Sequence, residues 1–253
     1  MGFDVAAEAY DRFMGRYSTL LSPQMADLAG VSAGQRVIDV GCGPGALTSE
    51  LVRRVGAGNV AAVDPSEPFV AATKLRYPGV DVRLAPAERL PFEDRSFDTA
   101  VSQLVVHFMT DAVAGLREMV RVTRPGGVVA ACVWDHAGSR GPLGTFWQAA
   151  NELDPGAQDE SRLAGAREGH LGELFEEAGL HEVQRSELTV RREHPSFDDW
   201  WEPYRAGVGP AGAYVAKLDP DAQARLRERC RELLPAAPFT IESVAWAARG
   251  IAG

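Results

Sequence analysis

The most constraining feature of this 253-residue chain is an apolar run that carries an acid and then breaks into alternate glycines. Val37-Ile38-Asp39-Val40 has the apolar, β-branched character of a buried strand, and Gly41-Cys42-Gly43-Pro44-Gly45 follows it directly. Residues 46–55 then have the spacing of an amphipathic helix. Because glycine has no Cβ, a strand, glycine turn and helix let the backbone approach a ligand closely. The segment therefore indicates a nucleotide-like cofactor.

Length and composition fit a globular enzyme with one large domain, since 45% of residues are hydrophobic and 24% are charged. The net charge of −9 disfavours nucleic acid as a partner. Three cysteines and five histidines are scattered, which predicts neither a disulfide framework nor a bound metal. No apolar run reaches the about 20 residues that a bilayer requires, and no signal peptide is recognisable, so we expect a cytoplasmic protein without membrane insertion.

Apolar runs alternate with helical patterns along the first half of the chain. This alternation predicts βαβ units and a parallel, doubly wound sheet, hence an α/β fold. The predicted strands cover residues 36–40, 59–64, 80–84, 97–104, 128–134, 183–192 and 240–249.

The domain organisation that we predict is a single domain over residues 1–253. A helical cap covers residues 1–30, and the cofactor-binding core covers residues 31–134. Residues 195–235 form a helical insertion before the last strand, which is typical of a lid or binding element. The oligomeric state is not predicted.

The glycine turn by itself leaves two cofactors open. Gly41, Gly43 and Ala46 also satisfy the dinucleotide fingerprint, and Asp64 lies 19 residues beyond Gly45, where an NAD-binding acid is expected. Asp39 favours a different ligand, because a carboxylate there repels a pyrophosphate and suits an ammonium group.

A second dehydrogenase-like feature is the pair Tyr214 and Lys217, which matches the YxxxK pair of short-chain dehydrogenases. It lies late in the chain, within the predicted insertion, and no TGxxxGxG loop precedes it. An NAD-dependent oxidoreductase is therefore the less favoured alternative.

Further motifs follow the glycine turn in a recognisable order. Together they resemble the class I S-adenosylmethionine-dependent methyltransferases, in the subgroup similar to the ubiquinone- and menaquinone-biosynthesis methyltransferases. The resemblance implies a Rossmann-like sheet of seven strands with the last strand antiparallel. It also implies S-adenosyl-L-methionine as cofactor and S-adenosyl-L-homocysteine as product. Besides residues 37–45, the matching segments are Val63-Asp64-Pro65-Ser66, residues 87–92, Ser96-Phe97-Asp98, residues 116–122 and Arg124-Pro125-Gly126-Gly127.

The resemblance assigns the methionine part of the cofactor to the end of the first strand. Asp39 and the backbone of Gly41, Cys42 and Gly43 would contact it. Gln103, at the end of the fourth strand, would lie near the methionine amino group.

The nucleoside part falls to two later segments. Asp64, followed by Pro65, would accept both ribose hydroxyls, and Ala87 and Glu88 would lie beside adenine. The family usually has an acid or amide before this alanine, whereas this chain has Pro86. The contact with the adenine amino group would then pass to Glu88 or to backbone.

Two further residues are candidates for the remaining chemistry. Arg16, in the N-terminal helix that covers the site in such proteins, would bind the cofactor carboxylate. His107 follows the fourth strand at its carboxyl end, where its imidazole would act as a catalytic base or simply pack against the cofactor.

The sequence thus predicts methyl transfer from S-adenosyl-L-methionine to an oxygen, nitrogen or carbon atom of a small molecule. A cofactor-binding protein of the same fold without methyl transfer, either a scaffold or a rearrangement catalyst, is the alternative. The aromatic residues Phe146, Trp147, Trp200, Trp201 and Tyr204 would line an acceptor pocket or, as we favour, attach small helices to the core.

Overall fold

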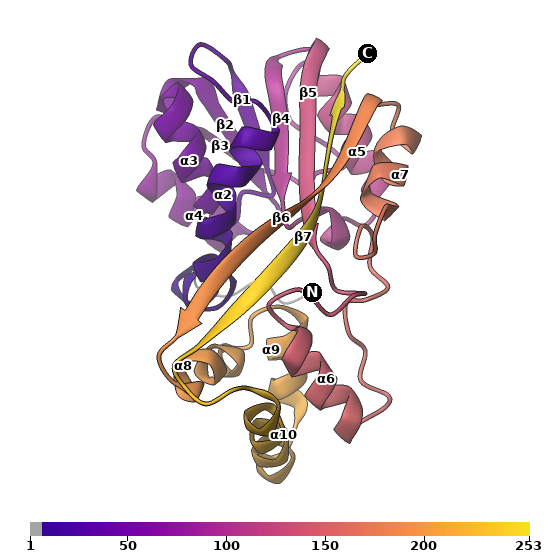
Figure 1. The fold of residues 1–253 in the computed structure, drawn as a ribbon. Coiled ribbons are helices and arrows are strands. Elements are labelled where there is room, and N and C mark those ends of the chain that lie inside the picture. The colour runs from indigo at the N-terminus through magenta and orange to yellow at the C-terminus, as the bar shows by residue number, and fades with distance from the viewer. Residues whose placement is uncertain (1–6) are drawn as a thin grey trace.

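The computed structural model of the protein describes residues 7–253 and contains one seven-stranded sheet with helices on both faces (Figure 1). The strand order across the sheet is β3-β2-β1-β4-β5-β7-β6. The strands are β1 (Val37–Val40), β2 (Val60–Asp64), β3 (Asp81–Leu84), β4 (Phe97–Gln103), β5 (Thr123–Trp134), β6 (His181–His194) and β7 (Phe239–Ile251).

The helices of the described chain fall into an amino-terminal group, the sheet crossovers and a carboxyl-terminal group. They are α1 (Ala7–Tyr10), α2 (Arg16–Leu28), α3 (Ala46–Val55), α4 (Glu67–Arg76), α5 (Ala112–Val122), α6 (Gly144–Leu153), α7 (His170–Glu177), α8 (Phe197–Trp201), α9 (Gly209–Lys217) and α10 (Pro220–Leu233). Shorter turns are the π-helical η1 (Asp11–Gly15) and the 3-10 helices η2 (Ala57–Asn59), η3 (Val106–Phe108) and η4 (Glu202–Ala206).

The pairing of the strands confirms the predicted fold class. Strands β1 to β5 run parallel, and β7 enters antiparallel between β5 and β6. All seven predicted strands are present. The one large difference is β5, which begins at Thr123 rather than at residue 128, because Thr123 already pairs with Phe97 before an irregularity in the ladder.

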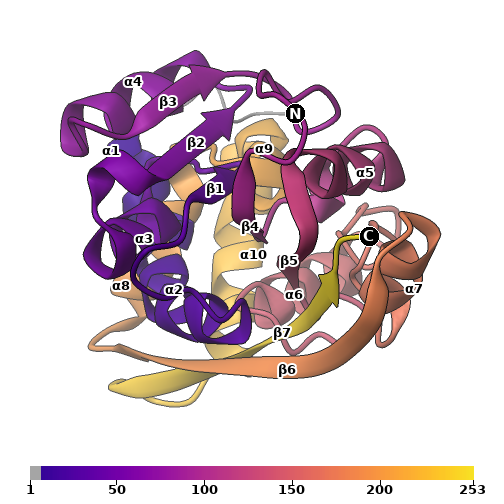
Figure 2. The ribbon, with the colours of Figure 1, turned by 90° about the horizontal axis from the view of Figure 1, so that it is seen from above.

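The sheet is covered on both faces, which explains the continuous apolar runs of its central strands (Figure 2). Successive side chains of a strand point to opposite faces. Ile38 of β1 therefore packs in a cluster with α5 and α7, whereas its neighbour Val37 packs with α2 and α3. Asp39 shares the Val37 face, and this places its carboxylate beside α3.

Strands β6 and β7 extend beyond the rest of the sheet as a long hairpin, and helices α8, α9 and α10 are inserted between them (Figure 1). Two of these helices begin at a side-chain N-cap. Ser196 Oγ accepts the N–H of Asp199, and the Asp219 carboxylate accepts the N–H of Ala222.

The inserted helices are attached by aromatic packing, as favoured from the sequence. Phe146 of α6 stacks on Tyr204 with 4.6 Å between ring centroids, and Trp200 and Trp201 complete the same buried cluster. None of these side chains lines the large cavity described below.

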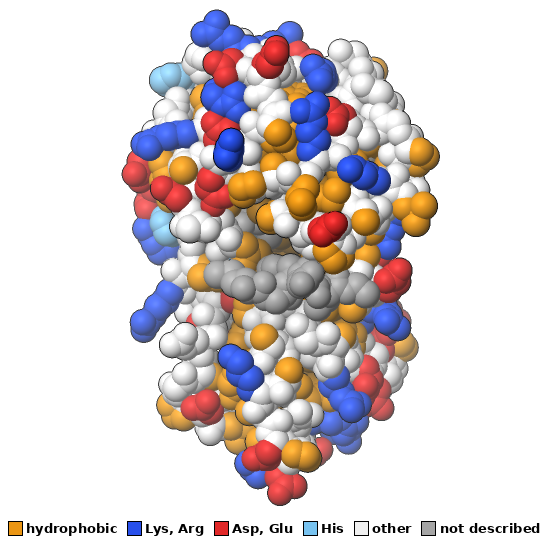
Figure 3. Space-filling model, turned by 180° about the vertical axis from the view of Figure 1, so that it is seen from behind, with side chains coloured by type: hydrophobic (Ala, Val, Ile, Leu, Met, Phe, Trp, Pro, Cys, Tyr) orange, Lys and Arg blue, Asp and Glu red, His pale blue; other side chains and the backbone are white. Residues whose placement is uncertain are grey.

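On the face seen from behind, positive and negative side chains are interspersed over both halves of the molecule (Figure 3). Within residues 7–253, no helix combines the length and the apolar character that crossing a membrane demands.

Phe146→Ala tests the aromatic attachment. Phe146 is fully buried, so truncation should lower the free energy of unfolding by about 3–5 kcal/mol, as is usual for large-to-small core changes. Urea unfolding followed by circular dichroism measures the change. Leu75→Ala is the matched control, because Leu75 is 85% exposed and its truncation should leave the midpoint unchanged. Equal midpoints for wild type and Phe146→Ala would contradict the packing role.

Candidate functional site

The carboxyl ends of parallel strands β1, β2 and β4 meet at one edge of the sheet, and a cavity lies there. It encloses about 1050 Å³ including space that opens to solvent. The glycine turn, the amino-terminal helices and the start of α9 all contribute to its wall.

The glycine turn requires glycine for two different reasons. Gly41 has a φ of +79°, and a Cβ there would lie 2.5 Å from the side chain of Val105. Gly43 has a φ of +52°, and a Cβ there would enter open space, because this residue borders the cavity. The backbone at Gly43 is therefore bare on the side from which a ligand approaches.

The buried carboxylate of Asp64 fixes the shape of this turn. Its Oδ2 accepts the N–H of Gly43 at 2.8 Å, and its Oδ1 accepts the N–H of Ser66 at 2.8 Å. Burial nonetheless raises the pKa of Asp64 above its ordinary value. Asp64 thus joins the β1–α3 and β2–α4 turns, a role that the sequence did not reveal.

Asp39 and Gln103 bring acceptor atoms without partners to the cavity. Thr48 Oγ1 donates to Asp39 Oδ2 at 2.7 Å, while Asp39 Oδ1 is buried without a partner among the described residues. Gln103 Nε2 donates to the Ser18 carbonyl oxygen at 3.1 Å and to Ser22 Oγ at 3.2 Å. Within the described chain its Oε1 also lacks a partner.

The unpartnered atoms provide a test of the cofactor that the resemblance implies. Two buried acceptors that find no donor within residues 7–253 fit a ligand that carries an ammonium group, since leaving them unpaired is costly. Burial raises the pKa of Asp39 to about 7, so a cation beside Asp39 would stabilise its charged form. The residues present therefore fit the methionine end of S-adenosyl-L-methionine.

The structure brings most of the predicted site residues to this one cavity. Those that line it are Asp39, Gly41, Cys42, Gly43, Asp64, Pro65, Gln103 and His107.

Arg16 is not among the residues that line the cavity. Its guanidinium pairs with the Asp199 carboxylate at 2.9 Å and donates to the Asp199 carbonyl oxygen at 3.1 Å. Asp199 also contacts His194 Nδ1 at 2.7 Å, and His194 Nε2 lies 2.9 Å from the Tyr17 hydroxyl. In this structure Arg16 therefore joins α2 to β6 and α8, and its binding of the cofactor carboxylate stays a prediction.

Ala87 and Glu88 also lie outside the lining of the cavity. Glu88 Oε1 accepts the N–H of Thr110 at 2.6 Å and the N–H of Asp111 at 3.2 Å. This carboxylate holds the loop that leads into α5, which leaves the adenine contacts predicted for this segment untested.

His107 lies in η3 directly after β4, 5% exposed, and its ring centroid is 5.4 Å from that of His136. Burial, together with His136, keeps the pKa of His107 well below its ordinary value. Its imidazole is therefore uncharged at neutral pH. Whether it accepts a proton from the acceptor stays a prediction.

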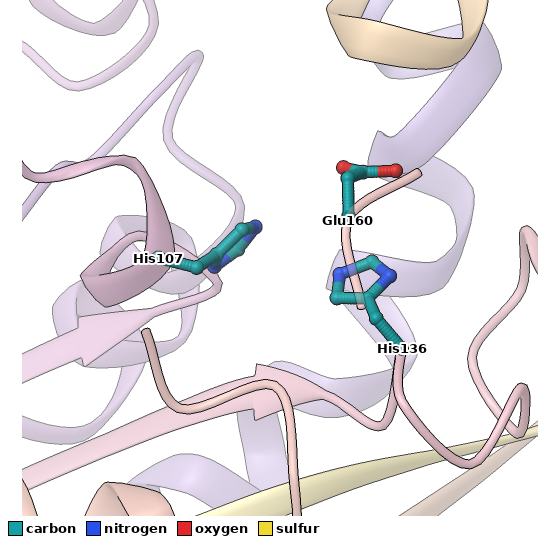
Figure 4. A group of neighbouring side chains, drawn as sticks. All are labelled: His107, His136 and Glu160. Atoms are coloured by element: carbon teal, nitrogen blue, oxygen red, sulfur yellow. The ribbon is translucent and has the colours of Figure 1, made fainter. Parts of the chain in front are cut away.

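Two residues near His107 were missed from the sequence. His136 follows β5, and Glu160 lies in the connection between α6 and α7, so both reach the cavity from far along the chain (Figure 4). The sequence gives no spacing that groups them. Only the proximity of the β4 and β5 ends could have indicated His136.

Comparison with known proteins identifies similarity to methyltransferases, which agrees with the fit of the cavity to S-adenosyl-L-methionine. Residues 38–131 match a family model described as a methyltransferase domain. This segment runs from β1 to β5 and includes the glycine turn, Asp64 and His107.

Two curated relatives are similar over part of the chain. A malonyl-[acyl-carrier protein] O-methyltransferase of Erwinia billingiae is 34% identical over 127 residues, 50% of this chain and 49% of the relative. A ubiquinone/menaquinone biosynthesis C-methyltransferase of Idiomarina loihiensis is 41% identical over 110 residues, 41% of this chain and 44% of the relative. The chain thus spans about half the length of these curated relatives.

Among solved structures, the YcgJ protein of Bacillus subtilis has the same fold. It superposes with a TM-score of 0.59 at 19% identity, covering 93% of this chain and 97% of YcgJ.

Asp39→Asn should change how stability depends on pH. The folded state keeps the Asp39 proton up to about pH 7, whereas the unfolded chain releases it near about pH 4. Between these values the Asp39 contribution to stability is lost as pH rises, by at most on the order of 4 kcal/mol. Asparagine keeps an acceptor for Thr48 and does not titrate. Urea unfolding should therefore show the variant gaining stability relative to wild type from pH 5 to pH 8.

Asp221→Asn is the control for that experiment, because Asp221 is an exposed carboxylate at the start of α10. This control should not reproduce the gain of stability with pH that is expected for Asp39→Asn. Parallel pH profiles for wild type and Asp39→Asn would mean that Asp39 is ionised throughout.

Proposed function

We propose that the chain is a class I S-adenosylmethionine-dependent methyltransferase that transfers a methyl group to a small organic acceptor, which the matches to methyltransferases support. The observation that carries the proposal is the pair of unpartnered acceptors, Asp39 Oδ1 and Gln103 Oε1, beside the bare backbone of Gly43. This arrangement suits a cationic ligand with a nucleoside attached and repels a pyrophosphate.

The chain's own residues act by binding and positioning. Asp39 and Gln103 would hold the ammonium group, and Asp64 retains lone pairs for the ribose hydroxyls while it fixes the turn. When bound, S-adenosyl-L-methionine supplies a methyl carbon to which the acceptor's lone pair bonds while the carbon–sulfur bond breaks and sulfur keeps its electron pair. The remaining work is alignment and exclusion of water.

The wall beyond Gln103 is where we place the acceptor. His107, His136 and Glu160 border this part of the cavity together with Leu143 and Val208. A mixture of apolar walls and a few polar groups is typical of a site for a small organic molecule. The two curated relatives are named for O- and C-methylation, so their names leave the acceptor atom open.

Binding of S-adenosyl-L-homocysteine, measured by calorimetry without acceptor, tests the cofactor assignment. Wild type should bind it with a Kd about tenfold lower at pH 8 than at pH 6, because binding requires the charged form of Asp39. Asp39→Asn should weaken binding at least about 30-fold at pH 8 and remove the pH dependence, since the buried ammonium loses its counter-charge. Asp221→Asn should bind as wild type does.

A dinucleotide is the competing ligand in the same experiment. Tight binding of NAD together with no heat from S-adenosyl-L-homocysteine would overturn the proposal in favour of an oxidoreductase. Transfer of labelled methyl groups into a metabolite extract then separates a methyltransferase from a protein that binds the cofactor without transferring methyl. A protein that binds the cofactor yet labels nothing in any extract would favour that alternative.

A further inference from the structure

A cluster of three metal-ligand side chains borders the acceptor end of the cavity (Figure 4). His107, His136 and Glu160 each offer one ligand atom, and these atoms all lie within 4.8 Å of one another. Figure 4 shows His107 and His136 pointing towards each other with their rings tilted, and the carboxylate of Glu160 beside the imidazole of His136. The three residues come from the end of β4, the end of β5 and the α6–α7 connection.

The cluster is held in place by its surroundings. Trp147 Nε1 donates to Glu160 Oε2 at 2.9 Å, which orients the carboxylate. The ring of Phe108 lies 3.9 Å from that of His107 between centroids. Glu160 is 3% exposed and His107 is 5% exposed. These contacts limit the freedom of the ligand atoms before anything binds.

Both imidazoles carry a buried nitrogen that the described chain leaves without a partner, Nδ1 of His107 and Nε2 of His136. A neutral imidazole has one nitrogen lone pair. Together with the carboxylate of Glu160, the two histidines therefore offer three electron-pair donors to an ion. Two histidines and one carboxylate are the donors with which zinc enzymes and non-haem iron enzymes hold their metal.

We propose that His107, His136 and Glu160 bind a divalent transition-metal ion, of which Zn²⁺ is the best-suited example. Three protein ligands leave at least one coordination position open towards the cavity. Zinc ligands lie about 2.0–2.2 Å from the ion, so the three ligand atoms, which lie within 4.8 Å of one another, would draw closer together around it.

The charge of the cavity favours a cation at this place. No lysine or arginine occurs among the described residues that line it, whereas Asp39, Asp64 and Glu160 do.

The role of the metal site rests on the proposed function, methyl transfer. The site adds to that function the chemical class of the methyl acceptor. An open metal position binds oxygen, so the acceptor would carry a hydroxyl group. The ion would lower the pKa of that hydroxyl, as it does for bound water, and the proton would leave to solvent. The oxygen lone pair would then bond to the methyl carbon as the carbon–sulfur bond breaks. His107 would hold the ion in that case, and no separate base would be needed.

The test is a titration of the full chain with Zn²⁺ in the absence of cofactor. The protein is first treated with a chelator, and calorimetry measures the binding. One equivalent of Zn²⁺ should bind to wild type. His136→Gln and Glu160→Gln should each weaken zinc binding at least 100-fold. His181→Gln is the matched control, because His181 is exposed on β6 and far from the cavity, and it should bind zinc as wild type does. Co²⁺ added instead should give visible absorption bands of low-coordinate cobalt in wild type and control only.

The outcomes separate the metal site from the proposed function. No zinc binding by wild type, or wild-type affinity in both cavity variants, would overturn the site. Glu160→Gln keeps an acceptor for Trp147, and its far-ultraviolet circular dichroism should match wild type, so loss of zinc is not loss of fold. Tetramethylammonium serves as a probe for an amine acceptor. If it binds at this cluster and zinc does not, the acceptor is an amine and the proposed metal site is wrong. S-adenosyl-L-homocysteine binding, measured on the same samples, reports the cofactor assignment independently.

Discussion

The carboxylate of Asp64 is the contact on which the site depends. With one oxygen on the N–H of Gly43 and the other on the N–H of Ser66, it ties the turn after β1 to the turn after β2. Thr73, in helix α4, donates a hydrogen bond from its Oγ1 to the Gly43 carbonyl oxygen at 2.8 Å. A glycine turn is free to take many conformations, and these bonds select the one that leaves its backbone open to the cavity. The turn is thereby preorganised, so a ligand need not order it.

The two ends of the cavity present different chemistry. At one end, Asp39 and Gln103 offer acceptors from the β1 and β4 ends, and both are held from behind by α2 and α3. At the other end, two uncharged imidazoles and a carboxylate face apolar walls. In the proposed function the methyl donor would contact the first end and the acceptor the second, and the reacting atoms would meet between them.

The sheet and the placement of Asp39 and the glycine turn at its edge could be predicted because these features are local in sequence. A strand, its glycine turn and its helix are adjacent, and buried parallel strands leave continuous apolar runs. The rest depends on contacts between distant segments. The partner of Arg16, Asp199, lies 183 positions away, so no local pattern showed that its charge is already paired. Glu160 comes from an irregular connection, and nothing in its neighbourhood relates it to His107 or His136.

The β6–β7 hairpin carries its three helices on strands that continue past the sheet, and these helices contact the remainder through an aromatic cluster and the Arg16–Asp199 ion pair. The β1–β5 half of the site and the hairpin end can therefore change independently in evolution. Residues at the hairpin end can be replaced, lengthened or reshaped in evolution while the β1–β5 half keeps its geometry. A sheet of one geometry can in this way be combined with insertions of different shape.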